Sequence, residues 1–500
     1  MSYLGKKVNT LKERPQYSSF LCYNTLMVKR ALIYQIYPAA YGNLKFITSK
    51  IPDIAEHIGP DYIWLNPFFL SPWREGGYDV ADYEVIDPRF GTMSDFKKLI
   101  EIAENHGIKI LLDLVLNHTS DQHEWFQKSR YRDPWYTDYY VWLDKQVNWQ
   151  SFFGGPAFKY DQIRGQYYLH LFHKSQPDLN FSNPRVVKEF QHIIKFWAKL
   201  GVAGFRVDSA NVLAESKFVS GFLPRIPGFF NYFQTQNTVK ILNKLLAGSQ
   251  LFNLAEPVGG NFFSHRKFSE LTDQAFDASF NVGILDAADT RLSDKSHLRP
   301  LNYKKWFKKL ANWTPEPKLS FALESHDAPR APSRFKADPK ALAMLQFLLP
   351  SNFPCIYQGQ EIGTENPKLG DSIEYYTGVQ SRSIYRQLIN EGKTNEHAMR
   401  IVKQVSRDNA RQPLDWHAYA SQSNDPQSIL NFYHQLVQLW RSDPVLIHGK
   451  LKVKKITKSG VFDFERHYGA QIYKIHLDLK SKTKSTLKDS TGKTLLSMLD

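Results

Sequence analysis

Residues Gly201–Asn211 read GVAGFRVDSAN, a pattern that predicts a helix stop, a short buried strand and charged side chains at the strand end. Apolar Phe205 and Val207 alternate with charged residues within this stretch. In an extended chain Arg206 and Asp208 therefore face the same side. A neighbouring arginine keeps an aspartate ionised, as a nucleophile or a ligand-binding carboxylate requires. A structural ion pair would explain the same two residues, so the other strand ends must decide between these interpretations.

Other short apolar stretches recur along the chain between Ala31 and Gln358. They alternate with amphipathic segments such as Ser94–His106, where apolar side chains recur at helical spacing and Gly107 supplies a stop. Because short buried strands that alternate with helices pair in parallel, eight such units predict a closed (β/α)₈ barrel. A doubly wound open sheet is the alternative, but no GxGxxG or GxxxxGKS/T motif follows any strand. The predicted strands are Ala31–Tyr37, Asp61–Leu65, Ile108–Leu116, Gly204–Asp208, Leu251–Glu256, Phe276–Phe280, Leu319–Glu324 and Cys355–Gln358.

Two regions depart from this alternation. Residues 118–180 are rich in Trp, Tyr, Phe and Gly without a clear helix pattern, which predicts an inserted domain after the third strand. Residues 426–500 begin with a helix and continue as alternating segments separated by Gly and Ser, which predicts a small C-terminal antiparallel domain of the sandwich type. The barrel is then expected to comprise residues 28–117 and 181–425.

The composition excludes several classes of protein. Hydrophobic residues make up 42% of the chain, enough for a large core, and the only cysteines are Cys22 and Cys355. This excludes a disulfide framework and fits a reducing compartment. No apolar run reaches the roughly 18 residues of a membrane span, and the N-terminus lacks a signal layout, so we expect a cytoplasmic location. Residues 1–27 lack periodicity, and we expect an N-terminal extension there, with Met27 as an alternative translation start.

The net charge of the chain is +15, and basic residues are densest in Lys450–Lys493. Because the lysines are spread out and form no long arm, we interpret them mainly as solvated surface, and we expect neither a nucleic-acid nor a membrane partner. The positive charge is also compatible with a phosphorylated or otherwise anionic substrate. The sequence does not determine the oligomeric state, for which we expect a monomer.

Polar side chains stand at the ends of four predicted strands. In a barrel these ends meet at one face, where the active site is found. Crowded carboxylates suit glycoside hydrolysis, in which one is ionised and attacks while another has a raised pKa and protonates the leaving oxygen. The chain offers no HxH or HExxH spacing, so we expect no catalytic metal. The strand-end residues are Asp113, Arg206, Asp208, Glu256, which follows apolar Leu254-Ala255, and the pair His326 and Asp327.

Several longer motifs contain these residues. They are Tyr34–Pro38 (YQIYP), Asp113–His118 (DLVLNH), Gln176–Asn180 (QPDLN), Gly204–Asp208 (GFRVD), Glu256 in LAEP, His326-Asp327 in ESHD, Tyr357–Gly363 (YQGQEIG) and Ser406–Pro413 (SRDNARQP). With these motifs in order, the chain resembles the α-amylase family of glycoside hydrolases (family 13), nearest its oligo-1,6-glucosidase and α-glucosidase branch. The resemblance covers about residues 28–450 and implies a (β/α)₈ barrel with an inserted domain B after strand three.

The resemblance implies a retaining, exo-acting α-glucosidase for isomalto- or malto-oligosaccharides. Asp208 would be the nucleophile, Glu256 the acid/base, and Asp327 the third carboxylate, which binds ring hydroxyls. Glu75 and Arg407 match the acid–arginine pair that closes the site beyond the non-reducing end, although relatives carry Asp in place of Glu. The further residues implied to bind the cleaved sugar are Tyr78 as a stacking platform, Asp113, His118, Phe172, Gln176, Arg206, which orients Asp208, and His326.

Three departures from the family pattern leave alternatives open. Ala39–Ile47 contains no acid where relatives often carry a calcium loop, so we expect no calcium and no other cofactor. Ser325 replaces the usual Asn before the His-Asp pair, and Ser209 follows the nucleophile where relatives carry Val or Ala. Because that last position is linked to the choice between 1,6 and 1,4 bonds, the linkage stays undecided. The alternatives are a glucosyl-transferring enzyme or isomerase on sucrose, maltose or trehalose, a hydrolase of 6-phosphorylated disaccharides, and a non-catalytic sugar-binding relative.

Overall fold

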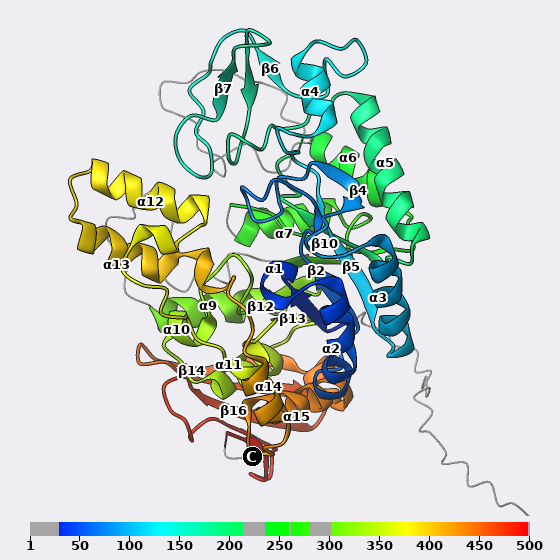
Figure 1. The fold of residues 1–500 in the computed structure, drawn as a ribbon. Helices are drawn as coiled ribbons and strands as arrows, with labels where there is room; N and C mark the ends of the chain where they lie inside the picture. Colours follow the sequence, from blue (N-terminus) through cyan, green and yellow to red (C-terminus); the bar gives the residue numbers. More distant parts are fainter. Residues whose placement is uncertain (1–29, 214–235, 260–261, 281–301, 499–500) are drawn as a thin grey trace, which may run out of the picture.

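A closed barrel of eight parallel strands forms the centre of the molecule (Figure 1). Each strand pairs with the next along the chain, and the last closes onto the first. The predicted barrel is therefore confirmed, and each of the predicted strands contributes to it. The strands are β1 (Ile33–Ile36), β2 (Tyr62–Leu65), β5 (Lys109–Val115), β9 (Gly204–Asp208), β10 (Phe252–Ala255), β11 (Ala278–Phe280), β12 (Leu319–Ala322) and β13 (Phe353–Tyr357).

The computed structural model describes residues 30–213, 236–259, 262–280 and 302–498. The expected N-terminal extension and the alternative start at Met27 lie outside the described residues. No helix in the described ranges is long and apolar enough to cross a membrane.

The barrel strands are buried on both faces, which explains their continuous apolar character. In β9, Phe205 and Val207 join the core that packs against the surrounding helices. The next strand passes so close that a Cβ on Gly204 would lie 1.8 Å from the carbonyl oxygen of Phe252. Only glycine fits there, which accounts for the first residue of the GFRVD motif.

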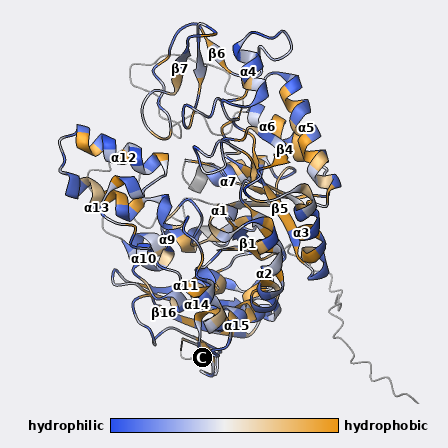
Figure 2. Cartoon of the chain, viewed as in Figure 1, coloured by the Kyte–Doolittle hydropathy of each residue, from blue (hydrophilic) through white to orange (hydrophobic). Residues whose placement is uncertain are grey.

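Helices surround the barrel and turn their apolar sides to it, as α5 and α3 show in Figure 2. The helix predicted at Ser94–His106 is α3, which begins with a capping box between Thr92 and Asp95. Asn183 caps α5 and Pro184 occupies its first turn, residue types that favour a helix start. The helices are α1 (Pro38–Tyr41), α2 (Leu44–His57), α3 (Met93–Asn105), α4 (Glu124–Arg130), α5 (Pro184–Lys199), α6 (Gln236–Leu246), α7 (Phe262–Leu271), α9 (Tyr303–Trp313), α10 (Ala331–Phe335), α11 (Pro339–Leu348), α12 (Val379–Asn390), α13 (Asn395–Val405), α14 (Trp416–Ser423), α15 (Ile429–Ser442) and α16 (Pro444–His448), with short 3₁₀ turns η1 (Gln360–Ile362), η2 (Ile373–Tyr375) and η3 (Arg407–Asn409).

The chain between β5 and α5 forms a separate structural unit at the top of Figure 1. It contains α4 and a three-stranded antiparallel sheet with its own small core around Trp149 and Leu171. A bridge between His118 and Asp178 joins the two ends of this insertion. The inserted domain after the third barrel strand is thus present as expected. Its strands are β6 (Trp142–Leu143), β7 (Phe158–Asp161) and β8 (Gln166–Leu169), and the hairpin of β3 (Phe69–Leu70) and β4 (Asp82–Ile86) precedes it.

The C-terminal strands form one five-stranded antiparallel sheet. The expected antiparallel domain is confirmed, but its sandwich character is wrong, because helices cover the buried face of the sheet and no second sheet does so in the described residues. Phe462, for example, stacks on Phe307 of α9 with ring centroids 4.7 Å apart. The strands are β14 (Lys450–Ile456), β15 (Val461–Tyr468), β16 (Gln471–Asp478), β17 (Thr486–Lys488) and β18 (Thr494–Ser497).

Candidate active site

One buried arginine links three carboxylates from neighbouring barrel strands. Arg206 Nη1 donates to Asp113 Oδ1 at 2.7 Å and to Asp208 Oδ1 at 2.8 Å. Its Nη2 forms an ion pair with Glu256 Oε2 at 2.5 Å. Burial alone would lower the pKa of Arg206, but these carboxylates raise it well above its ordinary value. The guanidinium therefore stays charged and holds the carboxylates around one point.

The register between the barrel strands explains why these side chains lie in contact. Arg206 lies directly opposite Asp113 across the β5–β9 pair and opposite Leu254 on β10. Glu256 follows β10 by one residue, and its backbone N–H donates to the carbonyl of Val207 at 3.0 Å. The carboxyl ends of parallel strands thus bring the side chains of Asp113, Arg206 and Glu256 to the same face of the barrel.

Glu256 has the electrostatics of a proton donor. Its side chain is 7% exposed. Burial raises the pKa of Glu256 to about 8, Arg206 opposes this rise, and the negative charge of Asp208 adds to it. The raised pKa favours the protonated form of the carboxyl group, which a proton donor needs.

Asp327 is held in the opposite state. Its Oδ1 accepts from Arg407 Nη1 at 2.9 Å and from Arg411 Nη2 at 3.0 Å, and its Oδ2 lies 3.0 Å from His326 Nε2. Burial alone would raise the pKa of Asp327, but His326 and the two arginines hold it well below its usual range. One site thus contains a carboxyl group with a raised pKa and a carboxylate with a lowered pKa, the division that acid–base chemistry on a sugar requires.

The tautomer of His326 follows from its neighbours. Gln35 Nε2 lies 2.8 Å from Nδ1 of the ring, and because an amide N–H₂ only donates, Nδ1 must be the acceptor. Burial lowers the pKa of His326 to about 4, so the ring is neutral and carries its proton on Nε2. That proton is directed at Asp327 and at the hydroxyl of Tyr78, 2.8 Å from Nε2.

Tyr78, His118 and Gln176 form the side of the site next to the inserted domain. The ring of Tyr78 stacks on His326 with centroids 5.3 Å apart, and its hydroxyl donates to Asp113 Oδ2 at 2.8 Å. His118 Nε2 lies 2.8 Å from Gln176 Nε2 and 3.1 Å from the carbonyl of Tyr78. Phe172 packs against His118, with ring centroids 5.2 Å apart. The inserted domain therefore contributes directly to the site.

The structure joins all the predicted site residues into one continuous network. Glu75 completes it, since its Oε2 lies 3.6 Å from Arg407 Nη2. Asp113 differs from the others in kind. Its side chain has no exposed surface, and Arg206, Trp64, Asn66 and Tyr78 all donate to its oxygens. Asp113 is thus placed to position Arg206, and its contact with a bound sugar stays a prediction.

Sequence reasoning missed several members of this network. Arg411 bonds Asp327 and also donates to the backbone carbonyl of His326 at 3.0 Å. It belongs to the quoted SRDNARQP motif, one helical turn after Arg407, so a signal for it was present. Phe153 of the inserted domain lies under the guanidinium of Arg407 at 5.3 Å. Nothing in the local sequence pattern marks Phe153, because its partner is far away along the chain.

The departures from the family pattern have distinct structural consequences. Ser209, directly after Asp208, has a φ of 48° and is 1% exposed. Such a left-handed conformation is strained for branched side chains. Ser325 Oγ accepts from the backbone N–H of Asp327 at 3.1 Å and so supports the turn that presents this carboxylate. Ala39–Ile47 forms α1 and the start of α2. No group of three or more His, Cys, Asp or Glu side chains in the described ranges is placed to hold a metal ion.

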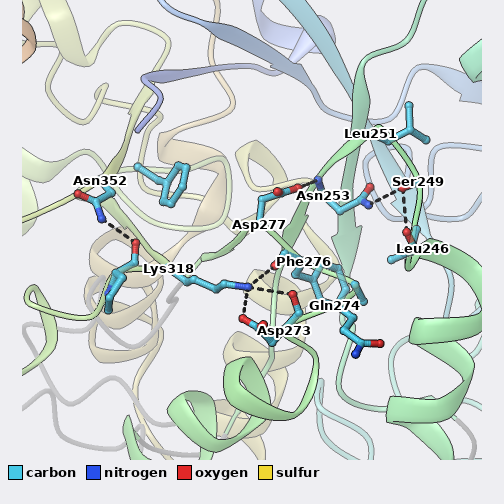
Figure 3. A pocket seen from close by; sticks show the side chains of 13 residues that line it. Leu246, Ser249, Leu251, Asn253, Asp273, Gln274, Phe276, Asp277, Lys318 and Asn352 are labelled. Atoms are coloured by element: carbon cyan, nitrogen blue, oxygen red, sulfur yellow. Dashed lines mark hydrogen bonds and ion pairs between the residues drawn. The ribbon is translucent and has the colours of Figure 1, made fainter. Parts of the chain in front are cut away.

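A cavity of about 530 Å³ lies at the other end of the barrel, near the start of β10, β12 and β13. On one side of this cavity the ammonium group of Lys318 donates to the backbone carbonyls of Asp273 and Phe276 and pairs with the carboxylate of Asp273 (Figure 3). The lining includes none of the strand-end carboxylates linked by Arg206. The cavity is therefore distinct from the candidate active site.

Comparison with known proteins agrees with this geometry. Residues 24–449 match the description "Alpha amylase, catalytic domain". The oligo-1,6-glucosidase of Parageobacillus thermoglucosidasius is 32% identical over 483 residues, covering 84% of each chain. A crystal structure of the trehalose-6-phosphate hydrolase of Bacillus licheniformis superposes with a TM-score of 0.82 at 29% identity, covering 92% of each chain. An isomaltulose synthase variant of Erwinia rhapontici NX5, solved with its natural substrate sucrose, gives a TM-score of 0.84 at 28% identity and the same coverage.

Proposed function

The chain belongs to the α-amylase family of glycoside hydrolases, and from this membership and the site geometry we propose that it is a retaining, exo-acting α-glucosidase. Its substrates are short α-glucosides, and its first expected substrate is an α-1,6-linked disaccharide such as isomaltose. The names of the oligo-1,6-glucosidase relatives support this choice of linkage.

The observation that carries the proposal is the shared contact of Asp208 and Glu256 with one guanidinium. Each has a carboxylate oxygen within 2.8 Å of a nitrogen of Arg206. The two carboxyl groups are therefore held close together, as in retaining enzymes, where they lie roughly 5–5.5 Å apart. Inverting enzymes need roughly 6.5–9.5 Å to place a water molecule between them.

In the first step Asp208 attacks the anomeric carbon while the bond to the leaving oxygen breaks. Glu256 gives its proton to that oxygen, and the aglycone departs as an alcohol. A covalent glucosyl ester on Asp208 results, with inverted configuration. Arg206 Nη1 holds the carboxylate of Asp208 at 2.8 Å, and the low pKa of Asp327 provides a negative charge beside the positive charge that develops on the ring.

In the second step a water molecule attacks the anomeric carbon of the glucosyl ester. Glu256, now ionised, takes a proton from the water, and the carboxylate of Asp208 leaves. The second inversion restores the α configuration of the released glucose. A sugar hydroxyl in place of water would give a transfer product. Hydrolysis and glucosyl transfer therefore use every residue named above in the same way.

Product analysis distinguishes these outcomes. We expect incubation with isomaltose, maltose, sucrose, trehalose and trehalose 6-phosphate to give α-glucose fastest from isomaltose, observed by NMR before mutarotation. A β-anomer as first product would contradict the retaining mechanism. Dominant transfer or isomer products, or a preference for the phosphorylated disaccharide, would favour the alternatives. Sugar binding without turnover would indicate a non-catalytic relative.

Exo-action gives a specific prediction for Glu75. Its side chain is 3% exposed and faces Arg407, where we propose that the pair binds the hydroxyls at the non-reducing end. In Glu75→Gln we expect KM for isomaltose to rise about tenfold or more, because a charge-assisted hydrogen bond contributes roughly 1.5–3 kcal/mol. Steady-state kinetics measure this, with Glu124→Gln on the exposed surface of α4 as the matched control. An unchanged KM for Glu75→Gln would remove Glu75 from the substrate site.

A further inference from the structure

The C-terminal sheet carries more than half of the net positive charge of the chain. Residues 450–493 contain twelve Lys and Arg and four Asp and Glu, which gives +8 of the total +15. The eleven lysines among them are all exposed. The arrangement of these lysines on the sheet decides whether they form one continuous positively charged surface.

The strand register sorts the side chains of the sheet into two faces. Phe462, Phe464 and Leu477 alternate with half-buried positions and point inward to the helices that cover the sheet. On the outer face, Lys452 lies opposite Glu465, Glu465 opposite Lys474, and Lys474 opposite Lys488. One row of charged residues thus crosses four strands, and Lys450 and Lys455 flank it on β14. We call Lys450, Lys452, Lys455, Lys474 and Lys488 the basic face.

The carboxylates of the outer face are already paired with other groups. Asp463 Oδ1 lies 2.6 Å from His476 Nδ1. Glu465 contacts His467 Nε2 at 2.8 Å and Lys454 Nζ at 3.4 Å. Within the described ranges no lysine of the basic face forms an ion pair. Its ammonium groups are therefore available to an anionic partner.

We propose that the basic face is a docking surface for an anionic lipid bilayer. The lysines lie on one sheet whose neighbouring strands are about 4.8 Å apart. A planar anionic surface can therefore come within the Debye length of about 8–10 Å of all of them at once. Each lysine near such a surface strengthens binding about fivefold. The spread of the lysines along the sequence led us to expect no membrane partner, but the strand register gathers five of them on one face of the sheet.

Three features favour a bilayer over a nucleic acid. The basic face contains lysine and no arginine, the residue that best reads phosphate and base edges. Arg466, the one arginine of the sheet, points inward and donates to the backbone carbonyls of Gly449, Leu348 and Leu446. The aromatic Phe462 and Phe464 also point inward and offer no platform for unpaired bases.

The position of the sheet is compatible with catalysis in the bound state. The sheet lies at the bottom of Figure 1, and the inserted domain, which contributes to the candidate site, lies at the top. A contact through the basic face therefore leaves the active-site end of the barrel exposed to substrate.

Cosedimentation of the full chain with lipid vesicles tests this proposal. The vesicles contain one part phosphatidylglycerol to two parts phosphatidylcholine, and vesicles of phosphatidylcholine alone are the reference. We expect binding only to the anionic vesicles at about 0.1 M salt and release at about 1 M salt. The variant Lys450→Thr, Lys452→Thr, Lys455→Thr, Lys474→Thr, Lys488→Thr is expected to bind at least ~100-fold more weakly.

The matched control removes the same charge from helices α3 and α5, through Lys97→Gln, Lys98→Gln, Lys188→Gln, Lys195→Gln and Lys199→Gln. It is expected to bind like the wild type. The double variant Lys474→Thr, Lys488→Thr, which changes fewer strand positions, is expected to bind about 25-fold more weakly. Equal losses in the control variant, no binding of the wild type to anionic vesicles, or tighter binding to a duplex DNA fragment would each overturn the proposal.

Discussion

The Asp208→Asn variant is expected to hydrolyse an aryl α-glucoside at least about 10⁴-fold more slowly than the wild type. Asparagine keeps the shape of the side chain but cannot form a stable glucosyl ester. The replacement also removes the negative charge that Arg206 Nη1 meets at 2.8 Å, and Arg206 still has Asp113 and Glu256 as partners. We therefore expect the fold to persist, with kcat as the parameter that falls.

A smaller nucleophile provides the decisive test of this role. In Asp208→Ala the space of the carboxylate is open to azide, which can attack the anomeric carbon from the same side. We expect added azide to restore turnover and to give a β-glucosyl azide, because only one inversion then occurs. Asp53→Asn on the surface of α2 is the matched control and should keep full activity. Wild-type rates in Asp208→Asn, or an α-glucosyl azide, would show that another group attacks.

The sequence predicted the barrel because its strands are buried on both faces and therefore appear as apolar runs. The C-terminal strands β14 to β16 were predicted from their alternation, whereas β17 and β18 have three and four residues, too few for a period to show. Alternation also reveals that one face of a sheet is buried but not what covers it. This is why a sandwich was expected where helices cover the sheet.

The candidate site was predictable to the extent that it depends on single strands. The two-residue period placed Arg206 on the same side as Asp208. The contacts of Arg206 with Asp113 and Glu256 depend on the register between strands, which no single-strand pattern contains. The left-handed backbone of Ser209 likewise lies just beyond β9, where the two-residue period of the strand no longer applies.

The pH dependence of hydrolysis is expected to report on Glu256. Its pKa is raised to about 8 by burial, and the first step needs the protonated form. Below this value the acid is present, and above it the acid is progressively lost. We therefore expect kcat/KM for isomaltose to fall as the pH rises through about 8, with one proton released. A profile measured from pH 6 to about 10 checks this, since the free-enzyme pKa governs kcat/KM.

Glu256→Gln separates proton donation from the other steps. The leaving group of isomaltose is the alkoxide of a glucose unit, which is strongly basic and leaves poorly unless it is protonated, so hydrolysis is expected to slow by about 10²–10⁴-fold. A dinitrophenyl α-glucoside has a leaving group that needs no proton, so formation of its glucosyl ester should slow far less and appear as a burst of dinitrophenol. The variant should also lose the decline near pH 8, because the titrating group is gone. Equal losses for both substrates, or a decline near pH 8 that persists in Glu256→Gln, would assign the acid to another group. Glu75 would be the next residue to test, because burial raises its pKa to about 7 against the opposing charge of Arg407.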